Sequence, residues 1–207
     1  MKIKFCGFTE KEDIKHAVHL GVDAIGIIFY EQSPRYVSID LAEELFHDLP
    51  PFVNRVGVFV NHDLDVVNTY AQRCQLDYVQ LHGEESVDFC LNCNTKVIKS
   101  FRVATSDDLL KISPYQGVVD GILLDTKLKG TYGGTGKTFD WGIAIAAKEF
   151  DVPLLLSGGI TIDNCKNAIQ LVAPYALDVS SGIESEPGKK DYEKMTKFLS
   201  SVTDIIG

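Results

Sequence analysis

Two apolar stretches near the C-terminal end of the sequence stop at glycines and serines whose spacing suits the binding of a phosphate group. They are residues 153–159, PLLLSGG, and residues 176–182, ALDVSSG. Glycine lets the backbone approach an anion closely, and the N–H groups at the start of a following helix attract negative charge. One Gly-Gly pair alone is more typical of a tight turn. Two such ends, one strand–helix unit apart, predict a phosphate clamp built from Gly158, Gly159, Ser180, Ser181 and Gly182.

Side chains capable of acid–base or ionic chemistry stand near the ends of apolar stretches along the chain: Cys6, Arg35, His82, Asp125 and, within the last of these stretches, Asp178. A thiol and a carboxyl group can exchange protons with a substrate, and a planar guanidinium fits a carboxylate. Each residue type also has an ordinary structural role: a buried cysteine, an exposed arginine, a hydrogen-bonded histidine or an aspartate that caps a turn. The residue types alone leave both roles open.

Short apolar runs alternate with amphipathic stretches along the whole chain, and this alternation predicts the elements that position those residues. Helix-like stretches separate the runs, and the first, residues 9–20, begins with a possible capping box in Thr9 and Glu12. Alternation of this kind favours parallel strands with helical crossovers. The eight runs are residues 3–7, 24–29, 55–60, 78–82, 97–103, 121–125, 154–158 and 176–180.

Two α/β architectures accept such an alternation, an open doubly wound sheet and a closed (β/α)₈ TIM barrel. The count of eight favours the barrel, and no linker interrupts the pattern. We therefore expect one (β/α)₈ barrel domain over residues 1–207. Functional residues of such a barrel lie at the C-terminal ends of its strands, which is where the residues named above stand.

Composition narrows the function classes. The chain has 207 residues, a net charge of -9 and a pI of about 5.0, which argue against nucleic acid or an anionic membrane surface as a partner. No run approaches the roughly 18 apolar residues of a membrane span. Five cysteines cannot all pair within one chain, and their spread favours a reducing cytoplasm. Cys90 and Cys93 lack the second ligand pair of a zinc site, so we expect no metal.

A glycine-rich segment, residues 130–138, raises the alternative of a nucleotide-binding P-loop. That motif requires four residues between its first glycine and the Gly-Lys pair. Here five residues separate Gly130 from Gly136, and no helical pattern opens at Lys137. The segment instead predicts a loop after the sixth strand that closes over a substrate.

Nine motifs, in order over nearly the whole chain, resemble those of the phosphoribosylanthranilate isomerase family. Any one of them is weak evidence, but nine in the same order are specific. They are Lys4-Phe-Cys6-Gly7-Phe-Thr9, Ser33-Pro-Arg35, Val56-Gly-Val-Phe-Val60, Val79-Gln-Leu-His82-Gly83, Leu124-Asp125, Gly133-Gly-Thr-Gly136, Phe139-Asp-Trp141, Ser157-Gly-Gly159 and Asp178-Val-Ser-Ser-Gly182.

The resemblance implies an Amadori rearrangement of a phosphoribosyl aminoaldose to an aminoketose, with no cofactor, by a chain acting as a monomer or homodimer. It implies that Cys6 is the general base and Asp125 the general acid. It also implies that Arg35 binds the anthranilate carboxylate and that His82 and Asp178 contact the substrate. Two alternatives are a related phosphosugar aminoaldose isomerase, which would use paired aspartates, and a non-catalytic phosphosugar-binding barrel, which would not need both Cys6 and Asp125.

Overall fold

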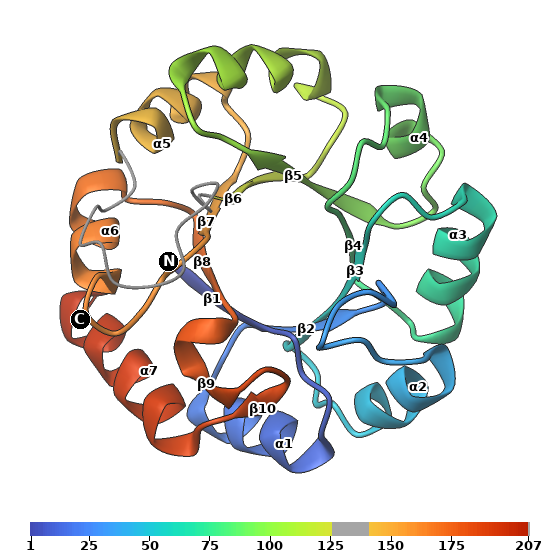
Figure 1. Ribbon diagram of the computed structural model, residues 1–207, viewed down its shortest axis with the longest axis vertical. Helices are drawn as coiled ribbons and strands as arrows, with labels where there is room; N and C mark the ends of the chain where they lie inside the picture. Colours follow the sequence, from blue (N-terminus) through green and yellow to red (C-terminus); the bar gives the residue numbers. More distant parts are fainter. Residues whose placement is uncertain (126–140, 207) are drawn as a thin grey trace.

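The computed structural model describes residues 1–125 and 141–206, and these residues form a closed barrel of eight parallel strands (Figure 1). Each strand pairs with the next in sequence, and β8 returns to pair with β1. The (β/α)₈ TIM barrel expected from the sequence is therefore confirmed. The strands are β1 Lys2–Cys6, β2 Ala24–Ile28, β3 Asn54–Phe59, β4 Tyr78–Leu81, β5 Lys96–Arg102, β6 Gly121–Asp125, β7 Leu154–Ser157 and β8 Ala176–Val179.

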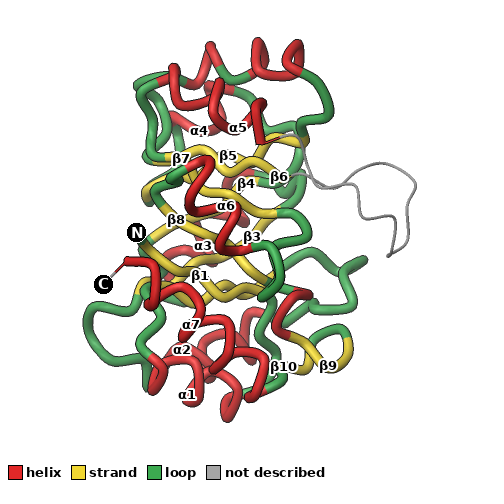
Figure 2. The backbone as a smooth tube through the Cα atoms, turned by 90° about the vertical axis from the view of Figure 1, so that its left-hand side faces the viewer, coloured by secondary structure: helices red, strands yellow, loops and turns green. Residues whose placement is uncertain are grey.

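Helices surround the strands on the outside (Figures 1 and 2). After β5 the structure has two short 3₁₀ helices, η1 Ser106–Lys111 and η2 Ser113–Tyr115, in place of one of the helix-like stretches that separate the apolar runs. Pro114 occupies the first turn of η2 and cannot donate the backbone hydrogen bond that would continue a longer helix. The α-helices are α1 Lys11–Leu20, α2 Ile39–His47, α3 Leu64–Arg73, α4 Val87–Leu91, α5 Trp141–Ala147, which η3 Lys148–Phe150 continues, α6 Cys165–Val172 and α7 Tyr192–Ile206.

The hydrophobic core has two parts because successive side chains of a strand point to opposite faces. Outward-facing residues such as Phe5, Ile25 and Ile27 are fully buried between the strands and the helices. Inside the barrel, Ile98, Leu123, Leu155 and Ala176 form a separate small cluster. The next inward-facing positions toward the C-terminal ends of the strands carry polar side chains, which is where the mouth of the barrel begins.

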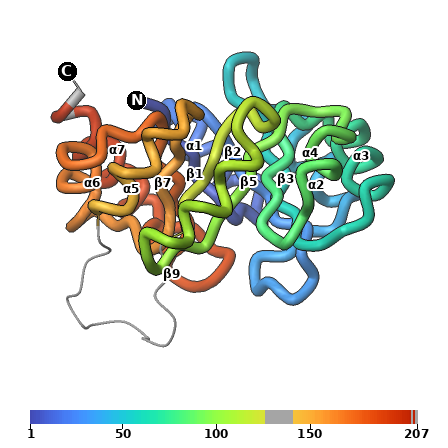
Figure 3. Tube along the Cα trace, turned by 90° about the horizontal axis from the view of Figure 1, so that it is seen from above, coloured from blue at the N-terminus to red at the C-terminus, as the bar shows by residue number. Residues whose placement is uncertain are grey.

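A small hairpin that the sequence did not predict follows β8. It consists of η4 Ser181–Ile183, β9 Glu184–Glu186 and β10 Lys189–Lys190. Its charged strands are too short to show an alternating apolar pattern. The hairpin lies at the opposite end of the barrel from the N-terminus (Figure 3).

Thr9 fixes this hairpin to the loop that precedes α1. The predicted capping box of Thr9 and Glu12 is wrong, because α1 begins at Lys11 and its N-cap residue, Glu10, makes no side-chain capping bond. The Thr9 hydroxyl instead donates a 2.7 Å hydrogen bond to the carbonyl oxygen of Gly188, in the turn between β9 and β10. The first and last parts of the chain therefore meet at the barrel mouth.

Cys90 and Cys93 show no sign of reactivity. All five cysteines are free thiols, and burial raises the pKa of both Cys90 and Cys93 to about 11. Both thiols therefore stay protonated near neutral pH. Within residues 1–125 and 141–206, no group of histidine, cysteine and carboxylate side chains is arranged to hold a metal ion. Over the same ranges, no helix has the length and apolar character needed to cross a membrane.

Candidate active site

A cavity opens at the C-terminal ends of the barrel strands, and residues from most of those ends line it. This is the place where a TIM barrel carries its functional residues. The loop predicted from residues 130–138 lies outside the described residues. The lining residues are Cys6, Ile28, Arg35, Val58, Gln80, His82, Asp125, Ser157, Gly158, Gly159, Ile160, Asp178, Ser180 and Ser181.

Cys6 ends β1 and points into the barrel beside Gly26, its neighbour in register on β2. A Cβ atom on Gly26 would lie 2.6 Å from the sulfur of Cys6 and 3.1 Å from Nζ of Lys4. Gly26 therefore leaves the space in which the thiol and the ammonium group of Lys4 lie together. Only 5% of Cys6 is exposed to solvent.

A buried ion pair lies next to this thiol. Nζ of Lys4 donates a 2.8 Å hydrogen bond to Asp178 on β8, and both side chains are almost completely buried. Burial raises the pKa of the Cys6 thiol, the positive charges of Lys4 and Lys190 oppose that rise, and the carboxylate of Asp178 adds to it. Burial also disfavours the charge on Lys4, but Asp178 and Cys6 together keep the pKa of Lys4 above its ordinary value. Lys4 is thus a permanent positive charge against the sulfur.

We expect Lys4→Met to slow alkylation of Cys6 by iodoacetamide severalfold at pH 8. The reactive species is the thiolate, and loss of the adjacent charge raises the pKa of the thiol. The rate is followed by mass spectrometry of the Cys6 peptide, with folding checked by circular dichroism. Lys2→Met is the matched control, because Lys2 lies on the same strand but is exposed and bonded to Asp23. Equal alkylation rates in the two variants would show that Lys4 does not influence the thiol.

His82 and Asp125 meet on the far side of the cavity. Nε2 of His82 lies 3.3 Å from Oδ2 of Asp125, and Nδ1 of His82 lies 3.2 Å from the side-chain nitrogen of Gln80. If the Gln80 amide donates to Nδ1, the imidazole is neutral and carries its proton on Nε2, facing the carboxyl group. Among the described residues, three buried side-chain atoms have no hydrogen-bond partner: Oε1 of Gln80, Oγ of Ser100 and Oγ of Ser180. Gln80 and Ser180 line the cavity, so their atoms can bond to a ligand.

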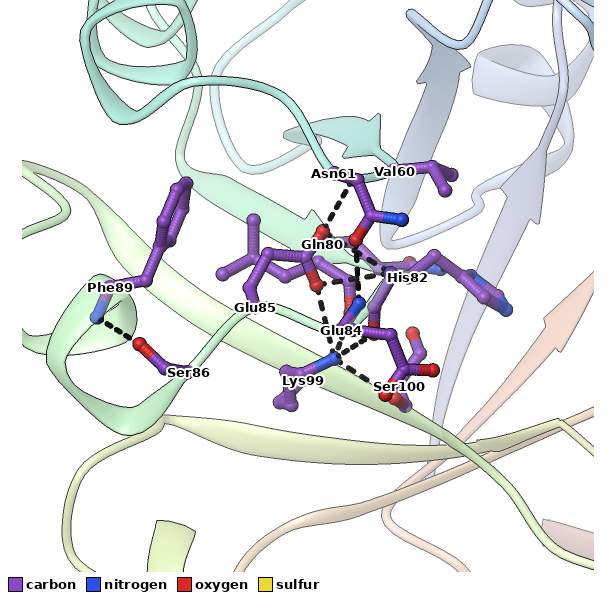
Figure 4. Close-up of polar contacts among 12 residues, drawn as sticks. Val60, Asn61, Gln80, His82, Glu84, Glu85, Ser86, Phe89, Lys99 and Ser100 are labelled. Carbon is purple, nitrogen blue, oxygen red and sulfur yellow. Dashed lines mark hydrogen bonds and ion pairs between the residues drawn. The ribbon is translucent and has the colours of Figure 1, made fainter.

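A second buried ion pair fixes the backbone around His82 (Figure 4). Nζ of Lys99 on β5 donates to the carbonyl oxygens of Leu81, at 3.2 Å, and Gly83, at 2.8 Å, which are the two neighbours of His82. The same Nζ lies 3.1 Å from the carboxylate of Glu85. Glu85 accepts hydrogen bonds from the backbone N–H groups of Asn61 and Gly83. The backbone on both sides of His82, and with it the direction of the His82 side chain, is therefore fixed by Lys99 and Glu85, which do not line the cavity.

Arg35 lines the cavity near Cys6 but is already bonded to one carboxylate. Its Nε and Nη2 atoms donate to the two oxygens of Glu184, at 2.8 and 2.6 Å. Its aliphatic stem packs on Gly7, where a Cβ atom would lie only 2.6 Å from Cδ of Arg35. Gly7 also has a φ of 79°, a conformation that favours glycine.

The predicted phosphate clamp occupies the ends of β7 and β8. Gly158 and Gly159 adopt φ angles of 82° and 73°, so the chain turns there in a way that other residues resist. They line the cavity together with Ser180 and Ser181. Gly182 does not line it. A Cβ atom there would collide with the carbonyl oxygen of Ile160, so Gly182 allows the two strand ends to pack against each other.

Comparison with known proteins places this arrangement in a family. Residues 3–201 match the family model described as N-(5'phosphoribosyl)anthranilate (PRA) isomerase. The chain belongs to the phosphoribosylanthranilate isomerase family. The resemblance drawn from the nine motifs is therefore confirmed.

Relatives support this membership over the full length of the chain. The N-(5'-phosphoribosyl)anthranilate isomerase of Geotalea uraniireducens is 48% identical over 198 residues, which cover 96% of each chain. The crystal structure of phosphoribosyl anthranilate isomerase from Thermotoga maritima is 41% identical, with a TM-score of 0.92 and 99% of each chain covered. Another phosphoribosyl anthranilate isomerase, in complex with reduced 1-(o-carboxyphenylamino)-1-deoxyribulose 5-phosphate, is 38% identical with a TM-score of 0.89, again with 99% of each chain covered.

The structure brings all but one of the sequence-predicted site residues to one cavity, Gly182 being the exception. Their roles in a phosphoribosylanthranilate isomerase reaction stay predictions. Sequence reasoning missed Lys4 and Gln80, which a strand period of two could have found, because each stands two residues before a predicted site residue on the same strand face. It also missed Glu184 and Lys190. No sequence pattern marked them, since they belong to the unpredicted hairpin.

Proposed function

We propose that this protein catalyses the isomerisation of N-(5'-phosphoribosyl)anthranilate to 1-(2-carboxyphenylamino)-1-deoxyribulose 5-phosphate, a step of tryptophan biosynthesis. One observation carries this proposal beyond family membership. A buried thiol, Cys6, and a carboxyl group, Asp125, line the same cavity from strands three places apart around the barrel. The glycine-rich ends of β7 and β8 lie between them. The reaction requires one acid and one base on different sides of a bound sugar phosphate.

In the proposed reaction, Asp125 donates a proton to the ring oxygen of the ribose. The ring C–O bond breaks and an iminium forms between C1′ and the anthranilate nitrogen. The Cys6 thiolate then removes the proton from C2′, and the C–H electrons form the C1′–C2′ double bond of an enolamine. Tautomerisation gives the C2′ ketone with a CH₂ group at C1′. His82, 3.3 Å from Asp125, stabilises the carboxylate that remains after the first proton transfer.

Substrate binding divides between the two sides of the cavity. The backbone N–H groups around Gly158, Gly159, Ser180 and Ser181 hold the phosphate, and they require no cationic side chain to do so. The buried polar atoms Oγ of Ser180 and Oε1 of Gln80 supply hydrogen-bond partners for the hydroxyl groups of the ribose. Asp178 lines the cavity near Cys6 while Lys4 holds its Oδ1 atom. Arg35 receives the carboxylate of the anthranilate ring.

Two related structures support a proposal for the ligand class and the oligomeric state of this protein. A phosphoribosyl anthranilate isomerase 38% identical to this chain binds a reduced analogue of the aminoketose phosphate. A further crystal structure, 37% identical to this chain, is of monomers generated from a dimeric phosphoribosylanthranilate isomerase of Thermotoga maritima. We therefore propose that this chain acts on a small phosphoribosyl substrate as a monomer or a homodimer in the cytoplasm. Light scattering of the purified protein determines the assembly.

The activity is tested by adding the enzyme to freshly prepared phosphoribosylanthranilate and following the loss of anthranilate-type fluorescence. Stoichiometric formation of the aminoketose, measured by chromatography and mass spectrometry, is the expected result. The histidine-pathway aminoaldose is supplied in a parallel assay. Turnover of that compound alone would favour a related aminoaldose isomerase, and binding of both compounds without turnover would indicate a non-catalytic phosphosugar-binding barrel.

Arg35→Ala is expected to raise KM for phosphoribosylanthranilate by about tenfold to a hundredfold while changing kcat much less. A charge-assisted hydrogen bond to a carboxylate contributes roughly 1.5–3 kcal/mol, and this interaction is made in both the ground state and the transition state. Steady-state kinetics separate the two constants. Arg73→Ala is the control, because Arg73 pairs with Asp40 and Glu43 on the outer surface. A loss of kcat with unchanged KM would contradict the binding role of Arg35.

A further inference from the structure

Glu184, in the hairpin after β8, is the shared partner of two cations at the cavity mouth. Its carboxylate accepts two hydrogen bonds from Arg35 and one, at 2.7 Å, from Nζ of Lys190. Lys190 also donates a 2.6 Å hydrogen bond to the carbonyl oxygen of Cys6. The side chains of Glu184 and Lys190 are almost fully buried. Glu184 therefore joins the hairpin to the loop after β2, and Lys190 joins the hairpin to the end of β1.

The way in which Glu184 binds Arg35 leaves part of the guanidinium for another anion. Glu184 occupies the edge formed by Nε and Nη2. A guanidinium has five N–H groups, so the two on Nη1 and the second on Nη2 remain to form a fork. Among the described residues, Nη1 donates no hydrogen bond, and Arg35 lines the cavity. The edge that remains can bind a second carboxylate with two parallel hydrogen bonds.

The charges of the cluster fit that role. Burial alone would raise the pKa of Glu184, but the hydrogen bonds and charges of Arg35 and Lys190 keep the pKa below its ordinary value, so the group is a carboxylate at neutral pH. Glu184 is shared between Arg35 and Lys190, so it does not by itself neutralise Arg35. A substrate carboxylate placed on Arg35 would balance the remaining charge.

We infer that Glu184 is a positioning residue that holds Arg35 in the orientation needed to select substrates with a ring carboxylate. This inference rests on the proposed function, since it concerns the same cavity and the same substrate. Glu184 is not among the residues that line the cavity. It acts by fixing one edge of the guanidinium. Arg35 then loses little side-chain entropy when its opposite edge binds the carboxylate.

The test measures binding of two ligands by calorimetry. One is reduced 1-(o-carboxyphenylamino)-1-deoxyribulose 5-phosphate, and the other is the same compound without the ring carboxylate. Glu184→Gln is expected to weaken binding of the first ligand by about tenfold and of the second by less than twofold, which corresponds to the loss of one charge-assisted hydrogen bond. Glu186→Gln is the matched control. It makes the same chemical change on the same short strand, but Glu186 is exposed.

A double-mutant cycle separates positioning from general structural support. In an Arg35→Ala background, Glu184→Gln is expected to cause no further selective loss, because the group that it positions is absent. Equal weakening of both ligands, tighter binding of the carboxylate ligand, or full additivity with Arg35→Ala would each overturn the inference. If Glu184→Gln unfolds, Glu184→Asp keeps the charge, shortens the side chain, and must show the same selective loss.

The same experiment distinguishes this inference from the proposed function. Suppose that the wild-type protein isomerises phosphoribosylanthranilate and prefers the carboxylate ligand. If the Glu184→Gln variant then shows the same preference, only the role of Glu184 is overturned. A wild-type protein that neither turns over the substrate nor distinguishes the two ligands overturns both.

Discussion

Cys6→Ser is expected to lower kcat for phosphoribosylanthranilate by about 10²- to 10⁴-fold, the usual contribution of a general base. Serine is nearly the same size as cysteine, so the cavity is preserved, but its hydroxyl group holds its proton far more tightly than a thiol. The variant should therefore bind substrate with little change in affinity and fail at the removal of the C2′ proton. Steady-state fluorescence kinetics measure kcat, and calorimetry with the reduced product analogue measures binding.

The pH dependence gives an independent check of Cys6. Burial raises the pKa of this thiol, so kcat/KM should rise with pH as the thiolate forms, with its midpoint above the ordinary cysteine value of about 8.5. This limb of the profile should disappear in Cys6→Ser. Cys74→Ser is the control, because Cys74 is an equally buried thiol at the end of α3, away from the cavity. Near-wild-type turnover in Cys6→Ser would exclude the thiol as the base.

Asp125→Asn is the second substitution for which we expect a loss of about 10²- to 10⁴-fold in kcat. An amide of the same shape can still bond to His82 but cannot donate a proton to the ring oxygen, so opening of the ribose ring becomes limiting. The loss should appear in single-turnover experiments with the enzyme in saturating excess over the substrate, which follow the chemical step rather than product release.

A matched control for Asp125 lies at the other end of the same strand. Asp120 precedes β6, is exposed, and accepts a hydrogen bond from the backbone of Val97 at the opposite mouth of the barrel. Asp120→Asn should leave kcat unchanged. If Asp125→Asn alters only KM, or if both substitutions lower kcat equally, then Asp125 is a binding or structural residue and not the acid.

The barrel could be predicted from sequence because each strand is a short, mostly apolar run. A strand that is buried in the fold needs apolar side chains, so its position is visible in the local sequence. Leu154–Ser157 and Ala176–Val179, for example, are mostly buried, and each has a single polar residue, Ser157 and Asp178, on the face that points into the barrel. The stretch after β5 could not be resolved in the same way. Its apolar spacing suits a helix of either type, and Pro114 explains only why one longer helix does not continue through it.

The site could be predicted only in part, because some of its residues are marked by local sequence patterns and others are placed by long-range contacts. Cys6, His82 and Asp125 were found because they stand where apolar runs end. Arg35 was predicted as a ligand-binding residue, but its pairing with Glu184 depends on two segments 149 residues apart, and no local pattern encodes such a contact. Thr9 shows the same limit, since its hydroxyl bonds across the mouth to Gly188 rather than within its own helix.

The long-range contacts of the mouth have a consequence for how the protein becomes active during synthesis. Lys4 and Asp178 are 174 residues apart, and Lys190 reaches the carbonyl of Cys6 across 184 residues. A nascent chain that lacks its last strand and hairpin has neither the partner of Lys4 nor the support of Arg35, although Cys6 and Asp125 are already present. Such contacts form late, because the ribosome must release nearly the entire chain before they can close. Partial chains should therefore be catalytically silent, and ribosome-arrested intermediates should gain activity only when the C-terminal segment emerges.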